Sequence, residues 1–185
     1  MTPELEARYA EPHRRYHTRT HIEQCLQFLA LVPDLTDGER QTLTYAIWWH
    51  DAVYDPAASD NEAQSAELAK AGLKAFDASL HVRDEVARLI LLTAGHEVEP
   101  GDRLGELLLS IDLAILAAPP AVYDLYATAV RAEYAFVPED AWRTGRTRVL
   151  QRFLDAAVIY PDPDFRTDFE AQARANIARE LAFLA

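Results

Sequence analysis

Cysteine is almost absent from this chain, since Cys25 is the only one among 185 residues. A single thiol cannot form a disulfide within the chain, so we expect a reducing compartment, the cytoplasm. A chain of this length buries a sizeable core without covalent staples. Cys25 shares one helical face with Ile22, Leu26 and Leu29, which predicts that it packs as a small apolar side chain.

Long apolar runs and basic residues are scarce as well. No stretch is long and apolar enough to span a bilayer, and the first ten residues carry acidic side chains rather than a secretory signal, so we expect no membrane segment. Lysine and arginine number 18 against 30 aspartates and glutamates, which gives a formal net charge of -12. That charge repels nucleic acid polymers and anionic lipid surfaces. A small anionic substrate would need local positive charge from a metal or an arginine.

Apolar residues at helical spacing run through almost the whole chain, in which 50% of residues are hydrophobic and 26% are charged. Spacings of three and four residues recur, and no alternating strand pattern is found. We therefore expect an all-α fold, with one domain over residues 1–185 built as a bundle of roughly seven to nine helices. Proline and glycine signals should separate these helices near positions 56, 99–102, 119–120, 138 and 161–163.

Two capping boxes predict helix starts. Thr36 is followed by Glu39, and Ser59 by Glu62, at the spacing in which a hydroxyl and a glutamate satisfy the first free N–H groups of a helix. Each pair predicts a helix that begins about one residue after the hydroxyl.

The stretch WWHDAVYD, residues 48–55, places the ionisable pair His50 and Asp51 directly after two tryptophans. The helix predicted from Thr36 should end here, because Pro56 follows closely. Neighbouring side chains in mid-helix point about 100° apart, whereas a helix end lets both converge on one point, such as a metal ion. The alternative is that the helix C-terminus holds His50 and that Asp51 caps a local turn.

Two further segments contain candidate metal ligands. Asp112 interrupts the apolar run GELLLSIDLAILAA, where an ionised carboxylate needs a cation, a buried arginine or a group of backbone amides. His13, His17 and His21 follow one another at intervals of four, so a helix would align them on one face, where two imidazoles can chelate a metal. A solvated face is the alternative for all three, and we adopt it for His13.

These residues carry a resemblance to a known family. The order of His21, the pair His50 and Asp51, and Asp112 is that of the HD superfamily of metal-dependent phosphohydrolases. The stretches YHTRTHI, WWHDAVYD, DNEAQSA, LTAGHE and RANIARELAFL resemble more closely the small bacterial proteins of that superfamily. The likeness runs from about residue 9 to the C-terminus and implies the all-helical HD-domain fold.

The resemblance implies that His21, His50, Asp51 and Asp112 bind one divalent ion, with a second ion left open. This mixed set of imidazoles and carboxylates suits Mn, Fe, Co, Ni, Zn or Mg. It also implies metal-assisted attack of water on a phosphate ester, with Asp51 counted among the catalytic residues.

Further residues are candidates for catalysis and substrate binding. The resemblance implies that Glu62 helps to activate water, as an acid shortly after the His-Asp pair does in related HD nucleotidases; the alternative is that Glu62 only closes its capping box. Arg15, His17, Tyr54 and His96 are expected to bind substrate: Arg15 as a phosphate clamp, His17 and His96 as phosphate contacts, and Tyr54 as a pocket wall. A surface role is the alternative for Arg15 and His17.

The expected function is that of a cytoplasmic phosphohydrolase, monomeric or homodimeric, that cleaves a phosphate ester of a small molecule, with a nucleotide as the expected class. One alternative is a metal-containing sensor that binds nucleotide or phosphate with little turnover. Another is a helical interaction domain whose histidines are structural. The residues that define a substrate pocket come from several helices, so local spacing does not identify the substrate.

Overall fold

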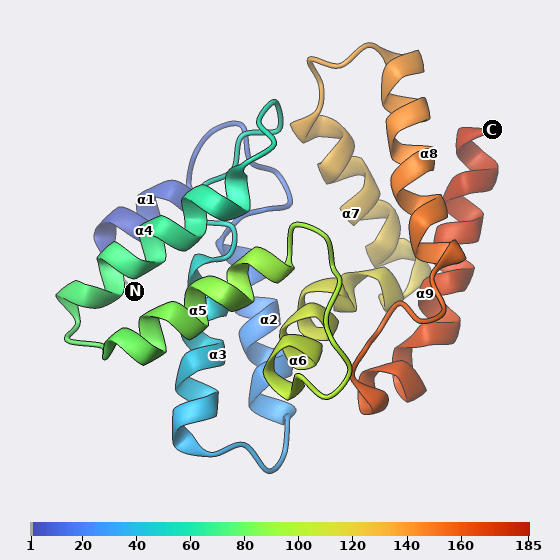
Figure 1. Cartoon of the computed structure of the whole chain (residues 1–185). Helices are drawn as coiled ribbons and strands as arrows, with labels where there is room; N and C mark the ends of the chain where they lie inside the picture. The colour runs from blue at the N-terminus through green and yellow to red at the C-terminus, as the bar shows by residue number, and fades with distance from the viewer. Residues whose placement is uncertain (1) are drawn as a thin grey trace.

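The computed structural model describes residues 2–185, which form helices and connecting loops with no β-strand among them (Figure 1). The elements are, in order, α1 (Pro3–Tyr9), α2 (Arg19–Leu31), α3 (Asp37–Trp49), α4 (Asn61–Ala75), α5 (Leu80–Leu92), α6 (Arg103–Asp112), the 3-10 helix η1 (Leu113–Ala117), α7 (Pro120–Glu133), α8 (Glu139–Asp155) and α9 (Pro163–Leu184). The expected all-α, single-domain fold is confirmed.

The first capping box is formed as predicted. The Thr36 hydroxyl accepts from the Glu39 N–H at 3.2 Å, and the Glu39 carboxylate accepts from the Thr36 N–H at 2.8 Å. Both bonds satisfy N–H groups that would otherwise lack a partner in the first turn of α3.

The second capping box is wrong, although α4 does begin close to the predicted position. The helix starts at Asn61, so Glu62 is its second residue and not the third, and the N-cap Asp60 makes no capping bond with its side chain. Asn61 explains the shift, because its amide oxygen accepts from the Asp55 N–H and its amide nitrogen donates to the Asp55 carbonyl. Glu62 is therefore left without the capping role.

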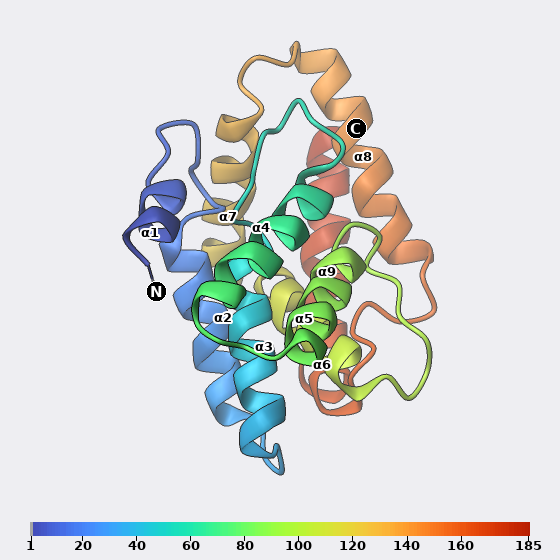
Figure 2. The same cartoon turned by 60° about the vertical axis from the view of Figure 1, so that its left-hand side comes forward.

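The helices form two groups. In the first, α4 packs on α5, and both α2 and α5 pack on α3; in the second, α8 and η1 pack on α9. Figure 1 shows α1–α5 on one side of the molecule and α7–α9 on the other, with α6 between them, and in Figure 2 the side with α1–α5 is turned toward the viewer.

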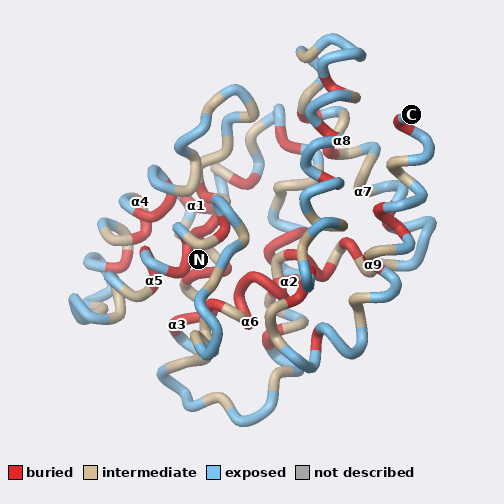
Figure 3. The backbone as a smooth tube through the Cα atoms, turned by 45° about the vertical axis from the view of Figure 1, so that its right-hand side comes forward, coloured by how far each residue is buried: buried red, intermediate tan, exposed pale blue. Residues whose placement is uncertain are grey.

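The core is centred on α6, because six of its residues are buried. A helix that is apolar nearly all round belongs inside a protein. The buried segments, red in Figure 3, also run along the facing sides of α2, α3 and α5. Cys25 is 2% exposed within this core, as predicted, and Trp49 is 7% exposed.

None of the helices between residues 2 and 185 is by itself long and apolar enough to cross a membrane. Only the bent pair Arg103–Ala117 and Pro120–Glu133 meets the requirements of length and composition together, across a 105° bend.

Candidate metal centre

Three helix ends place the predicted ligands. His21 lies in the first turn of α2, His50 is the C-cap of α3 with Asp51 in the turn that follows, and Asp112 is the last residue of α6. The His50–Asp51 pair thus lies at a helix end, as its sequence context predicted. The imidazoles of His21 and His50 are 3% and 2% exposed, so water does not solvate them appreciably.

The ligand atoms of these side chains converge on one point. The His21 Nε2 and His50 Nε2 atoms are 3.3 Å apart. Asp112 Oδ1 lies 3.1 Å from His21 Nε2 and 3.4 Å from His50 Nε2, while Asp51 Oδ2 lies 3.2 Å from His50 Nε2 and 3.7 Å from His21 Nε2. Ligands about 2.0–2.2 Å from an ion lie about 3 Å from one another when they are adjacent around it. His21, His50 and Asp51 could therefore hold a metal ion, and Asp112 is placed to complete the set.

Hydrogen bonds outside the cluster favour the tautomers that a metal needs. The Nδ1 atom of His50 lies 2.9 Å from the Ile47 carbonyl, which can only accept, so Nδ1 carries the hydrogen and leaves the Nε2 lone pair directed into the cluster. The Nδ1 atom of His21 lies 3.0 Å from the Tyr16 hydroxyl, which can take its hydrogen in the same way. Partners of this kind orient metal-binding histidines.

The two carboxylates of the cluster favour a positive charge between them. Burial alone would lower the pKa of His50, but the carboxylates of Asp51 and Asp112 raise it well above its ordinary value. Burial would likewise raise the pKa of both carboxyl groups, yet the neighbouring histidines lower each of them. Two carboxylates and two neutral imidazoles carry a charge that one divalent ion balances, which fits the chemistry of the ligand set.

Cys25 lies beside the cluster, with its Sγ atom 3.8 Å from both ring nitrogens of His21. Burial raises the pKa of its thiol well above the ordinary value. Only a thiolate is a good metal ligand, so the carboxylates are better ligands here than Cys25.

His96 approaches the cluster from the end of α5. Its Nε2 atom lies 3.2 Å from Asp112 Oδ2, so Asp112 contacts His96 with one oxygen and the His21–His50 pair with the other. His96 has a φ of 54°, the left-handed region, although Gly95 directly precedes it and would adopt that region without strain. The His96 N–H donates to the Leu92 carbonyl at 2.9 Å, so this residue closes the left-handed turn that ends α5 and directs its side chain toward Asp112.

Glu133, the last residue of α7, organises the other side of the cluster, and the sequence analysis did not identify it. Its Oε1 atom accepts from the backbone N–H groups of residues 15–17 at 2.7–3.0 Å. Its Oε2 atom lies 2.7 Å from His17 Nδ1 and accepts from the Tyr54 hydroxyl at 2.9 Å. The one available signal was its place on the apolar face of α7 with Tyr126 and Val130, which would bury its carboxylate.

Arg14 joins the same loop to the turn after α3. Its buried guanidinium donates to the carbonyls of His17, Asp51 and Ala52 at 2.8–3.2 Å. Arg15, predicted as a phosphate clamp, is instead exposed, donates to the carbonyls of Pro12 and Arg14 and does not line the cavity over the cluster. Its placement supports the surface alternative.

His13 also lies away from the ligand cluster. Its Nε2 atom lies 2.7 Å from the Tyr54 carbonyl, and its side chain is 43% exposed. This position agrees with the surface role that the sequence suggested. Residue 13 precedes α2, so the three histidines do not share one helical face.

A cavity of about 660 Å³ opens over the cluster. The predicted site residues in its wall are His17, His50, Asp51, Tyr54, Glu62, His96 and Asp112. His17 and Tyr54 stack in this wall with ring centroids 4.1 Å apart. Glu62 is half-buried and its side chain makes no hydrogen bond or ion pair with any other described residue, so its carboxylate is free to act in the cavity.

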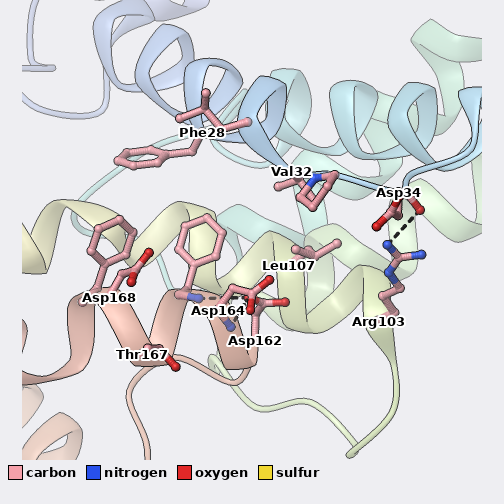
Figure 4. A pocket seen from close by; sticks show the side chains of 13 residues that line it. Phe28, Val32, Asp34, Arg103, Leu107, Asp162, Asp164, Thr167 and Asp168 are labelled. Atoms are coloured by element: carbon pink, nitrogen blue, oxygen red, sulfur yellow. Dashed lines mark hydrogen bonds between the residues drawn. The ribbon is translucent and has the colours of Figure 1, made fainter.

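A second cavity, of about 530 Å³, lies between α2, α6 and the start of α9 (Figure 4). Its wall holds several aspartates but no histidine. Arg103 donates there to the Asp34 carbonyl at 2.9 Å, and Asp162 accepts from the first N–H groups of α9. These groups cap and join elements, so this cavity is not the candidate metal centre.

Comparison of the chain with protein-family models, with curated proteins and with solved structures found no match. The functional argument therefore rests on the chemistry and geometry of the cluster and on the resemblance of the sequence motifs.

Proposed function

We propose that the protein is a metal-dependent phosphohydrolase of the HD superfamily, which cleaves a phosphate ester of a small molecule, with a nucleotide as the leading class. The observation that supports it most is the convergence of two imidazole nitrogens and two carboxylates within 3.1–3.7 Å. The resemblance in sequence supplies the reaction class, and the free wall of the adjoining cavity supplies space for a substrate.

A divalent ion in such a set lowers the pKa of a water molecule and polarises a phosphoryl oxygen. His21, His50, Asp51 and Asp112 would hold it. Glu62 is the one acidic side chain of the cavity wall that has no other partner, so it would take a proton from the attacking water. His96, beside Asp112, would donate a hydrogen bond to a phosphate oxygen.

The ion would also overcome an unfavourable overall charge. With a net charge of -12, the chain repels phosphate esters at a distance. A resident cation reverses that sign where the phosphate must bind, which a cluster of structural histidines and aspartates would not do.

The first test measures metal content and metal binding in tag-free protein. The wild type should retain, or bind on titration with Mn²⁺, about one equivalent of metal, and should gain thermal stability with it. His50→Ala should lose both effects, whereas His81→Ala, which removes an exposed histidine outside the cavity, should retain them. A wild type that neither binds metal nor is stabilised by it would refute the proposal.

A second measurement separates a hydrolase from a sensor. Phosphate release from mononucleotides, diphosphates and sugar phosphates would be followed with Mn²⁺, Co²⁺, Ni²⁺ or Mg²⁺. The proposal expects turnover with at least one ester and its loss in Glu62→Gln, which leaves the ligand set intact. Tight nucleotide binding without phosphate release would favour the sensor.

A further inference from the structure

One arginine in the cavity wall has no partner. The cavity over the metal centre contains two arginines, Arg146 and Arg152, both from α8. Arg146 is buried and donates two hydrogen bonds to Glu180, at 2.8 and 3.0 Å, so its charge is compensated. The Arg152 guanidinium makes no hydrogen bond or ion pair with any residue that the structure describes.

Aromatic contacts connect Arg152 to the metal centre. Its guanidinium carbon lies over the Phe153 ring, 5.7 Å from the centroid. The Phe153 ring packs edge-on against the His96 ring at a centroid distance of 5.9 Å, and His96 Nε2 lies 3.2 Å from Asp112. Arg152 therefore lies in the same cavity wall as the ligand Asp112, with the Phe153 and His96 rings between them.

The charges of the cavity limit what this cation can bind. One divalent ion balances Asp51 and Asp112, and Glu180 balances Arg146, so Arg152 is the one arginine of the cavity wall left for an anion, and the unpaired carboxylate of Glu62 adds a negative charge to the same wall. A guanidinium matches two phosphate oxygens at once. A second or third phosphate group would add negative charge for which the wall holds no further lysine or arginine.

Much of the remaining wall is apolar or aromatic. It contains Leu116, Val130, Tyr134, Trp142, Val149 and Phe153. The cavity volume of about 660 Å³ is within the ordinary range for small-molecule sites. Such a wall favours an organic group with a flat or apolar surface.

We infer that Arg152 binds the phosphate of the substrate, and that this substrate is a phosphate monoester whose organic group is aromatic or apolar. The inference rests on the proposed function, because it assumes a resident ion beside Asp112. It assigns to α8 the clamp role that the sequence had suggested for Arg15.

The test uses ligands that the protein cannot hydrolyse. Binding of phenylphosphonate to the Mn²⁺-loaded full chain would be measured by calorimetry in the wild type and in Arg152→Gln, with Arg148→Gln as the control. Arg148 is exposed on the same helix one turn earlier and lies outside the cavity wall. Loss of a charge-assisted hydrogen bond should weaken binding about tenfold or more in Arg152→Gln, while Arg148→Gln should bind as the wild type does.

The outcomes distinguish this inference from the proposed function. Failure of the wild type to bind Mn²⁺ would refute both. Normal Mn²⁺ binding with unchanged phenylphosphonate affinity in Arg152→Gln, or an equal loss in both variants, would refute the role of Arg152 alone. Arg152→Lys should recover part of the affinity, since it retains the charge without the paired donors.

Two ligand comparisons test the substrate class. Phenylphosphonate should bind more tightly than methylphosphonate, and equal affinity would overturn the aromatic or apolar assignment. In Glu62→Gln, which is expected to bind nucleotides without turnover, and with free Mn²⁺ held constant, AMP should bind at least as tightly as ADP. Clearly tighter binding of ADP would overturn the restriction to a single phosphate.

Discussion

Among single residues, Glu133 shows how one buried carboxylate can organise a site to which it contributes no ligand. It fixes the loop of residues 15–17 through backbone hydrogen bonds and holds Tyr54 through its hydroxyl. Tyr16 of that loop contacts His21, and His17 stacks on Tyr54. The orientation of His21 and the shape of the cavity wall thus depend on a residue at the end of α7.

Replacing Glu133 should cost considerable stability. In Glu133→Gln the amide nitrogen cannot accept the bonds now made by His17 and Tyr54, so we expect a loss of about 2–4 kcal/mol in the free energy of unfolding. Urea denaturation would measure it. Glu139→Gln is the matched control, because Glu139 is 60% exposed and pairs only with Arg131, and such surface pairs contribute about 0–1 kcal/mol. Equal losses in the two variants would contradict the role of Glu133.

The contact between Glu133 and His17 predicts that stability depends on pH. Burial would raise the pKa of Glu133, but hydrogen bonds from His17 and the backbone lower it to about 2, so its contribution is present above its unfolded pKa and is lost as the pH falls toward 2. Burial would lower the pKa of His17, but Glu133 and the other carboxylates raise it, so its contribution is present below its unfolded pKa and is lost as the pH rises through the folded value.

Both contributions are therefore present between about pH 4.5 and pH 6.5, the ordinary pKa values of the two side chains. The stability difference between wild type and Glu133→Gln should be largest in that window and smaller at pH 3 and pH 9, the two conditions to compare by urea denaturation. A difference that does not vary with pH would show that the pair does not titrate as described.

Among the helices, two glycines in helix interiors should respond in opposite ways to alanine. A Cβ atom on Gly72 in α4 would overlap the Trp49 ring, whereas a Cβ atom on Gly145 in α8 would meet no atom within 4 Å. Alanine is favoured over glycine inside a helix by about 0.5–1 kcal/mol. Gly145→Ala should therefore raise the thermal midpoint, while Gly72→Ala should lower it because α4 must move away from Trp49. A stabilising Gly72→Ala would show that the two helices separate at little cost.

Helix positions were largely predictable because they depend on local chemistry. The Thr36–Glu39 box starts α3 as predicted, and the helix ends at the His50–Asp51 pair. The second box was wrong because Asn61 is bonded to Asp55, six residues earlier, and this contact competes with the local capping pattern. Local signals thus located both helix starts to within about a residue, but not the role of Glu62.

In the molecule as a whole, the site combines segments that lie far apart in the chain, so only some of its residues could be predicted from the sequence. The four candidate ligands were singled out by their residue types and by the resemblance in sequence. Glu133 and Arg152 were not, because their roles depend on how α7 and α8 pack beside helices that precede them by many residues. Arg152 is one of several arginines of α8, and no local property of the sequence distinguishes it as the arginine whose guanidinium makes no hydrogen bond or ion pair with the described residues.

Because the net charge of the chain is -12, salt should change the association rate constants of Mn²⁺ and phenylphosphonate in opposite directions. Raising the ionic strength from about 0.01 M to about 0.15 M shortens the screening length from about 30 Å to about 8 Å. The association rate constant of Mn²⁺ should therefore fall, because the attraction of the acidic chain is screened, while that of phenylphosphonate for the Mn²⁺-loaded protein should rise, because a repulsion is screened. Stopped-flow measurements test both, and replacing NaCl by KCl at constant ionic strength should change neither. Rates that move in the same direction would mean that charges near the cavity, rather than the charge of the whole chain, control access to the site.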